Sequence, residues 1–159
     1  MLVTETQFIT QLFALSYHIS MENNITTDFG PNPFIVDIQR AALGNDTYRT
    51  VIWTGEHLQV ALMSVDVGGD LGLEVHPETD QFIRIEQGSG VALMGNTSTN
   101  LYIQQMVFED DSIFVPAGTW HNVVNTGHVQ LKICTTYAPP HHPWGTVEPT
   151  RAIPVENEH

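Results

Sequence analysis

The stretch GLEVHPETDQ, residues 72–81, places a carboxylate, an imidazole and a carboxamide close together in a segment that is typical of a strand followed by a turn. Side chains of a strand alternate between its two faces, so Glu74 and His76 are expected to share a face. Burying such a polar pair is costly unless each group finds a partner. If this face points inward, the partner of Glu74, His76 and Gln81 is solvent, another side chain or a metal ion.

A second stretch, VPAGTWHNVVN at residues 115–125, extends this candidate site. Pro116 fixes its own φ and Gly118 permits a positive φ, so the pair predicts a tight turn between two strands. His121 opens the second of these strands. In a closed barrel it can face a strand distant in sequence, and we expect it to complete the polar group of the first stretch. Asn125 is expected to be structural, because Asn tolerates unusual backbone angles and bonds its own turn.

The surrounding region, from Phe34 to about Tyr137, is a succession of short runs rich in Val, Ile, Phe and Tyr and broken by Gly, Asn, Asp and Pro. Many short strands at close spacing favour an antiparallel barrel or sandwich. The first runs are PFIVDI, YRTVIWTG, LQVALMSVDV and LGLEVH, and the last are DSIFVP, HNVVNTG and VQLKICTTYAP.

A chain of 159 residues with 42% hydrophobic content suits one globular domain. Phe8, Leu12, Leu15 and Ile19 recur at helical spacing, so residues 4–20 are predicted to form an amphipathic helix. The end of the chain carries most of its nine prolines and is expected to wrap the surface as a tail. The predicted organisation is therefore a helix and loop at 1–33, a β-barrel at 34–138 and a tail at 139–159.

These residues resemble the two signatures of the cupin superfamily. Gly68, Glu74, His76, Gln81 and Gly88 follow the spacing of the first cupin motif, which is Gly, five residues, His-x-His, three or four residues, Glu, six residues, Gly. The second motif is matched in spacing by Pro116, Gly118, His121 and Asn125, while Asp110 stands where its leading Gly would be. Together with YAPPHHPWGTV at 137–147, the sequence of these segments is similar to that of small single-domain bacterial cupins of the mannose-6-phosphate-isomerase-like type.

The resemblance implies an all-β fold, a cupin double-stranded β-helix or jelly-roll barrel, with the N-terminal helix and the Pro-rich C-terminal tail outside it. It also implies a divalent metal ion, whose identity (Zn, Mn, Fe or Ni) the sequence leaves open. Family enzymes commonly bind metal through three His and one Glu, and the matching positions here are Glu74, His76, Gln81 and His121. Two imidazoles and one carboxylate still satisfy a 2-His-1-carboxylate requirement, whereas the amide of Gln81 is a weaker ligand.

Other residues receive more general expectations. Asp80 alternates with Gln81 and is expected to face away from it and to cap the turn at HPETD, while Arg84 and Glu86 are expected to form an exterior pair. The lone Cys134 is expected to be a small core residue. Candidates for the substrate pocket are Arg49, Trp53, Gln59, Met63, Trp120, Tyr137 and His142, with Tyr48 and His141 beside them.

Charge limits the partners. A formal net charge of -13 repels nucleic acid and anionic lipid, so neither is expected to bind. Without a signal peptide or a membrane-spanning stretch, the expected location is the cytoplasm. Exposed strand edges and an extra amphipathic segment favour a homodimer.

Two classes of function agree with these features, and both take a small molecule. The first is a metal-dependent enzyme in which Glu74 also acts as a catalytic group: an isomerase acting on a sugar-like, carbonyl or enediol substrate, or a dioxygenase if the metal is iron. The second is a cupin that only binds or senses a small ligand.

Overall fold

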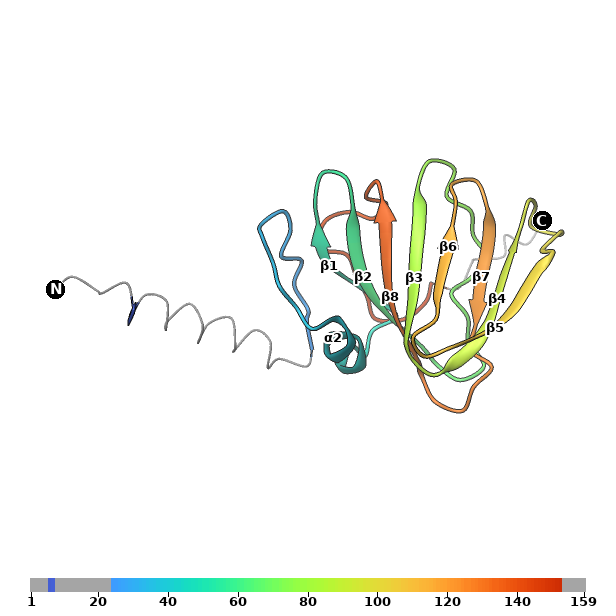
Figure 1. The fold of residues 1–159 in the computed structure, drawn as a ribbon, viewed down its shortest axis with the longest axis horizontal. Helices are drawn as coiled ribbons and strands as arrows, with labels where there is room; N and C mark the ends of the chain where they lie inside the picture. The colour runs from blue at the N-terminus through green and yellow to red at the C-terminus, as the bar shows by residue number, and fades with distance from the viewer. Residues whose placement is uncertain (1–5, 8–23, 153–159) are drawn as a thin grey trace.

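The structure is a computed structural model that describes residues 6, 7 and 24–152. Its strands are β1 (Arg49–Thr54), β2 (Gln59–Val65), β3 (Asp80–Gln87), β4 (Ser89–Gly95), β5 (Ile103–Phe108), β6 (Ser112–Val115), β7 (Trp120–Val124), β8 (Leu131–Ala138) and β9 (Val147–Glu148). They form a six-stranded sheet in the order β6-β3-β8-β2-β1-β9 and a three-stranded sheet in the order β5-β4-β7, with antiparallel pairing throughout. Figure 1 shows the strands side by side as the wall of one barrel. The predicted all-β barrel is confirmed.

The main core lies between the two sheets. Alternate residues of the six-stranded sheet, such as Ile83 and Ile133, pack against Ala92 of β4, Val107 of β5 and Val123 of β7. Ile83 and Ile133 are fully buried, as expected for the inward phase of strands that cover a closed core. The same phase places Gln81 inside, two residues before Ile83, so the core positions determine which polar side chains reach the interior.

The outer face of the six-stranded sheet is covered by helix α2 (Ile38–Gly44). Ala41 and Ala42 of the helix pack against Leu62 of β2 and Cys134 of β8 in a second buried cluster. Cys134 is thus the core residue that was predicted, and burial raises the pKa of its thiol to about 12.

The prediction that PFIVDI, residues 33–38, forms a strand was wrong. Its β-branched residues favour strand locally, but Asp37 caps a helix by accepting a hydrogen bond from the Arg40 N–H. The sequence QRAALG that follows is rich in helix formers, and packing on the sheet stabilises this short helix.

The segment 70–76 also differs from the expected strand. It pairs with β7 only through two isolated bridges, Asp70 to Val124 and Glu74 to His121. The turn after it is held by the predicted PAG turn, in which Gly118 has a φ of 78° and donates its N–H to the His76 carbonyl at 2.8 Å. Asp80 faces away from the interior as predicted, but its carboxylate accepts from the Ala117 N–H of this turn, not from the HPETD turn.

The two ends of the chain relate to the prediction in different ways. The helix predicted for residues 4–20 lies almost wholly outside the described residues. In the tail, a short edge strand that the prolines did not predict, β9, pairs with β1 through Arg49 and Thr50. Within residues 6, 7 and 24–152, no helix is long and apolar enough to span a membrane.

Candidate metal centre

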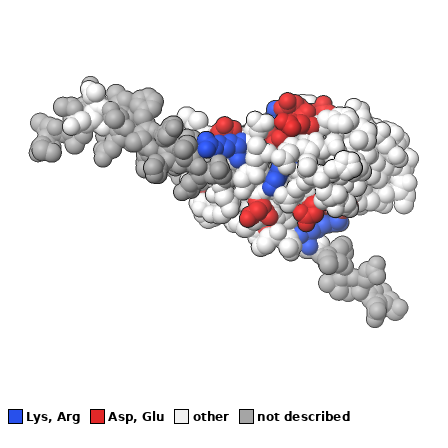
Figure 2. Space-filling view, turned by 90° about the horizontal axis from the view of Figure 1, so that it is seen from below, with Lys and Arg blue, Asp and Glu red and all other residues white. Residues whose placement is uncertain are grey.

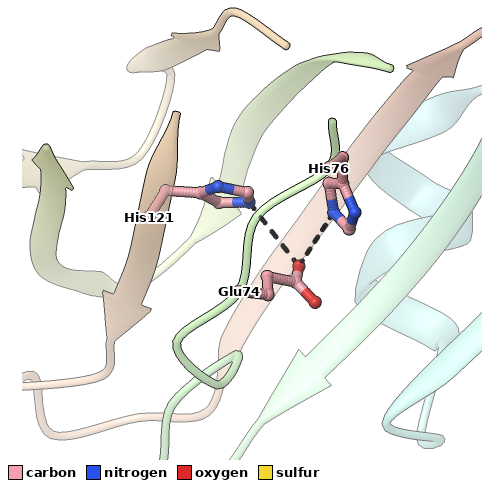
Figure 3. A group of neighbouring side chains, drawn as sticks. All are labelled: Glu74, His76 and His121. Atoms are coloured by element: carbon pink, nitrogen blue, oxygen red, sulfur yellow. Dashed lines mark ion pairs between the residues drawn. The ribbon is translucent and has the colours of Figure 1, made fainter. Parts of the chain in front are cut away.

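Three potential metal ligands meet inside the barrel. Glu74 and His121 are joined by two backbone hydrogen bonds, at 3.0 and 2.9 Å, so their side chains project to the same side of this bridge. His76 lies on the same connection as Glu74, whereas His121 comes from β7 (Figure 3). The Glu74 carboxylate oxygen Oε1 lies 3.3 Å from His76 Nε2 and 3.6 Å from His121 Nε2. One ligand atom from each residue falls within 4.8 Å of the others, so the group is able to hold a metal ion.

The chemistry of this group fits a cation. The Nδ1–H of His121 donates to the Thr119 carbonyl at 2.9 Å, a tautomer inferred from this contact, which leaves the Nε2 lone pair facing the site. That nitrogen lies 2.8 Å from Gln81 Oε1, another acceptor. The Nε2 of His76 is buried and has no hydrogen-bond partner within residues 6, 7 and 24–152. A cation between these atoms would satisfy all of them at once.

Gln81 is aimed at the site by a neighbour that sequence reasoning missed. Its amide nitrogen donates to Thr135 Oγ1 at 2.9 Å, and this bond turns its carbonyl oxygen toward His121. Thr135 is fully buried on the inward face of β8. The available signal was its phase, since Thr135, like Ile133 and Tyr137, belongs to the inward set of that strand. Hydrogen bonds from neighbouring residues commonly fix the orientation of metal ligands in this way.

Replacing Gln81 with Ala is therefore expected to weaken metal binding only moderately. A neutral amide contributes less to a divalent ion than an imidazole or a carboxylate, so we expect a loss of about 10-fold in Zn²⁺ affinity. Competition with a chromophoric chelator measures it. A loss as large as that of a His121 variant would show that Gln81 is an equal ligand, and no loss would show that it does not face the ion.

The electrostatics favour an ionised Glu74. Burial by itself raises the pKa of Glu74, but the adjacent imidazoles of His121 and His76 outweigh burial and lower it well below the ordinary range. A carboxylate that holds a proton so weakly suits metal ligation better than proton transfer.

Two histidines of the tail lie over the site. The His141 ring packs on His76 with centroids 4.1 Å apart, and the His142 ring meets Tyr137 at 5.0 Å. Buried Gln59 holds this segment, since its amide donates to the His142 carbonyl at 2.8 Å and accepts from the His142 N–H at 2.9 Å. Burial lowers the pKa of both imidazoles, that of His142 to about 3, so both are neutral near pH 7.

The inward residues of the large sheet complete the surroundings. Gln59, Tyr137 and Gln81 form one row across β2, β8 and β3, so all three face the interior beside the ligands. Arg49 pairs with Met63, two inward positions further along β2 than Gln59, and is also buried. A groove between the 76–79 turn and the 139–141 segment opens from His76 to the surface.

Three pocket candidates are placed elsewhere. Met63 belongs to the hydrophobic core, and Trp53 lies in an apolar surface groove with Phe34 and Val60. Trp120 precedes His121 on β7, so alternation turns it to the outer face. Tyr48 donates its hydroxyl to the Leu71 carbonyl at 2.6 Å. Arg84 pairs with Glu86 and also contacts Asp110, but the prediction of an exterior pair was wrong for Glu86, whose side chain is fully buried.

Comparisons with known proteins agree with this geometry. The sequence profile of the cupin domain matches residues 61–137. Protein YrkC of Bacillus subtilis (strain 168) is 54% identical over 136 residues, which cover 86% of this chain and 73% of YrkC. The chain belongs to the cupin family. Protein L612 of Acanthamoeba polyphaga mimivirus is 38% identical to this cupin over 119 residues, covering 74% of this chain and 72% of L612.

A solved structure supports the same assignment. The crystal structure of BH2720 from Bacillus halodurans superposes on this cupin with a TM-score of 0.77 and 54% sequence identity, covering 78% of this chain and 94% of BH2720. The fold also explains the one departure in the second motif. Asp110 has a φ of 72°, a left-handed conformation that Gly adopts freely and that Asp tolerates better than most residues.

Proposed function

We propose that this cupin is a cytoplasmic metal-dependent enzyme that acts on a small polar substrate with a carbonyl or enediol oxygen, in an isomerase-type reaction. The observation that carries the proposal is the convergence of Glu74, His76 and His121 inside the barrel, where the buried His76 Nε2 finds no hydrogen-bond partner among the described residues. Glu74, His76 and His121 would hold the ion, and Gln81 would assist. A bound divalent ion supplies Lewis acidity toward such an oxygen.

The remaining residues support proton transfer next to that oxygen. The imidazole of His141 lies beside His76, where it can accept and return a proton, while that of His142 packs against Tyr137 and stays neutral. Gln59 fixes their backbone and so holds both rings over the interior. The groove beside His76 gives a small molecule a route from the surface. Isomerisation through an enediol requires this combination of a polarised oxygen and a nearby proton carrier.

A second candidate follows from the ligand types. Two His and one carboxylate also match the set used by iron-dependent dioxygenases. Elemental analysis of the protein purified without added metal separates the two readings, because iron favours oxygen chemistry and zinc or manganese favours isomerisation. Protein that takes up no metal would leave only a ligand-binding cupin.

The isomerase reading predicts hydrogen exchange at carbon. In D₂O, the metal-loaded protein is expected to place deuterium next to the carbonyl of one member of a panel of hydroxyaldehydes, ketoses, sugar phosphates and small keto acids, observed by NMR. His141→Asn should retain the metal and lower this rate by about 100-fold, the usual scale for losing a general base. Exchange by His141→Asn at the wild-type rate would remove that residue from the mechanism. Oxygen uptake without exchange would favour the dioxygenase.

We also propose that this cupin forms a homodimer through the outer face of the three-stranded sheet. Residues 88–108, which include β4 and β5, contain no charged side chain although the chain carries a net charge of -13. On edge strand β5, Met106 and Phe108 are 48% and 54% exposed. In Figure 2 the right-hand end of the molecule, where Figure 1 places these strands, shows no charged residue. Two acidic chains would repel each other least across this surface.

Met106→Lys is expected to convert the dimer to a monomer, because it places two like charges in a dimer interface related by symmetry. Sedimentation velocity at tens of micromolar protein measures the state. The exposed Val129→Lys, on the loop before β8, provides the control and should remain dimeric. A monomeric wild type at this concentration would contradict the dimer, and a dimeric Met106→Lys would move the interface elsewhere.

A further inference from the structure

Three unpartnered polar atoms lie together in the barrel, beside the metal ligands. Arg49 Nε, the Tyr137 hydroxyl and His142 Nε2 are buried and find no hydrogen-bond partner in the part of the chain that the structure describes. Tyr137 is fully buried, and Arg49 is 6% exposed. Buried donors are normally satisfied, so each such atom needs an explanation. A guanidinium N–H and a phenol O–H side by side can both donate to one anionic acceptor.

These groups are close enough to act on one another. Burial raises the pKa of Tyr137 to about 12, and the charge of Arg49 opposes this rise. The Tyr137 and His142 rings are 5.0 Å apart. The Tyr137 ring also lies 5.8 Å from the ring of the metal-ligand candidate His76, which places these atoms beside the metal centre.

Arg49 already has one acid partner, but that pair leaves part of it free. Its Nη1 donates to Glu148 Oε2 at 2.6 Å, while its Nε remains without an acceptor. The Glu148 side chain is 38% exposed, so this partner approaches from the rim of the barrel. A guanidinium presents several donors in a rigid plane and can bind a second anion on another edge.

Charge balance points the same way. Glu74 and Glu148 carry two negative charges against the single positive charge of Arg49. A bound divalent ion would leave this end of the interior with a positive excess, which favours an anionic ligand.

We propose that Arg49 and Tyr137 form a subsite for the carboxylate of a small substrate whose other oxygen faces Glu74, His76 and His121. One guanidinium and one hydroxyl match the two oxygens of a carboxylate. A phosphate, with more oxygens and up to two charges, would need further donors. The inference deepens the proposed function and rests on it, because it assigns the substrate class as a small hydroxy or keto acid.

Calorimetric titration tests the subsite, with glycolate as the probe and the uncharged glycolamide as its matched control. Zn²⁺ affinity is measured first, and both probes are then titrated into Zn²⁺-loaded and metal-free protein. Glycolate is expected to bind the loaded wild type and glycolamide to bind at least 10-fold more weakly, as expected when a charge-assisted hydrogen bond is lost. Inorganic phosphate is titrated in parallel, and tighter binding of phosphate than of glycolate would overturn the carboxylate assignment.

Variants locate the binding. Arg49→Met keeps the aliphatic stem and is expected to weaken glycolate binding by about 10- to 100-fold, whereas Tyr137→Phe is expected to weaken it by about 3- to 10-fold. The controls are Arg40→Met on α2 and Tyr102→Phe, whose ring is 67% exposed, and both should bind glycolate like the wild type. Circular dichroism verifies the folding of each variant, and Tyr137→Phe tests the subsite by itself if Arg49→Met does not fold.

The outcomes separate this inference from the proposed function. If Zn²⁺ binds and glycolate affinity is the same in wild type, Arg49→Met and Tyr137→Phe, the subsite is wrong and the metal centre stands. If the wild type binds no metal, the proposed function fails. In that case, glycolate binding to the metal-free wild type that is lost in Arg49→Met would support the anion subsite alone. If the metal-free wild type bound no glycolate, the subsite would be overturned as well.

Discussion

His121→Ala is expected to abolish stoichiometric metal binding and to leave a folded barrel. Its Nε2 is one of three ligand atoms that converge in the interior, so its loss should lower Zn²⁺ affinity by at least about 100-fold, in line with the loss of tightly held ligands. The truncation leaves a cavity at one end of a packed core, which costs only a few kcal/mol in stability. Metal per chain is measured after dialysis, and circular dichroism reports the fold.

The matched control is His57→Ala. The His57 side chain is 86% exposed and far from the ligands in sequence, so this variant should retain the full metal content. If His121→Ala kept one equivalent of metal, for instance at His141 and His142, the proposed ligand set would be wrong.

Asn125→Ala should cause a large loss of stability without contacting the metal ligands. The buried side chain donates to the carbonyls of Val65 and Val129, both at 2.9 Å, and accepts from the Gly127 N–H at 3.0 Å. Removing it takes away three hydrogen bonds, one of them to the buried Val65 carbonyl, so we expect the free energy of unfolding to fall by about 2–4 kcal/mol. Urea denaturation of the metal-free protein measures the change.

Asn96→Ala is the comparison for this variant, because the Asn96 side chain bonds only Asn100 at the exposed β4–β5 turn. Its effect should stay within about 0.5 kcal/mol, as is usual for surface substitutions. Equal losses in the two variants would show that Asn125 is not the internal brace that the structure indicates. The result distinguishes a polar motif residue that stabilises the fold from one that binds a ligand.

Much of the site was predictable because it depends on two local rules. Strand alternation turned Asp80 and Gln81 to opposite faces, and the PAG turn placed His121 at the start of a strand. Glu74 and His76 meet as predicted, although their segment is not a regular strand. These rules act over a few residues and do not require the rest of the fold. The resemblance to the cupin motifs then supplied the one long-range statement, that the two stretches meet.

The remaining features depend on contacts that are distant in sequence. Gln59 and the tail histidines are 82 and 83 residues apart, and no local pattern indicates that the amide of one holds the backbone of the others. The inward position of Arg49 depends on the register of β1 against β2, where a bulge separates Val51 from Trp53 and shifts the phase. Trp53, predicted with the same strand, lies outside for this reason.

The most direct test of the central claim is a crystal structure of the Zn²⁺-loaded protein, with anomalous diffraction measured on both sides of the zinc edge. We expect one strong peak inside the barrel, within about 2.0–2.2 Å of Glu74 Oε1, His76 Nε2 and His121 Nε2. Gln81 Oε1 should lie nearby. A peak bound instead by His141 and His142, or no peak in the interior of a crystal grown with stoichiometric zinc, would contradict it.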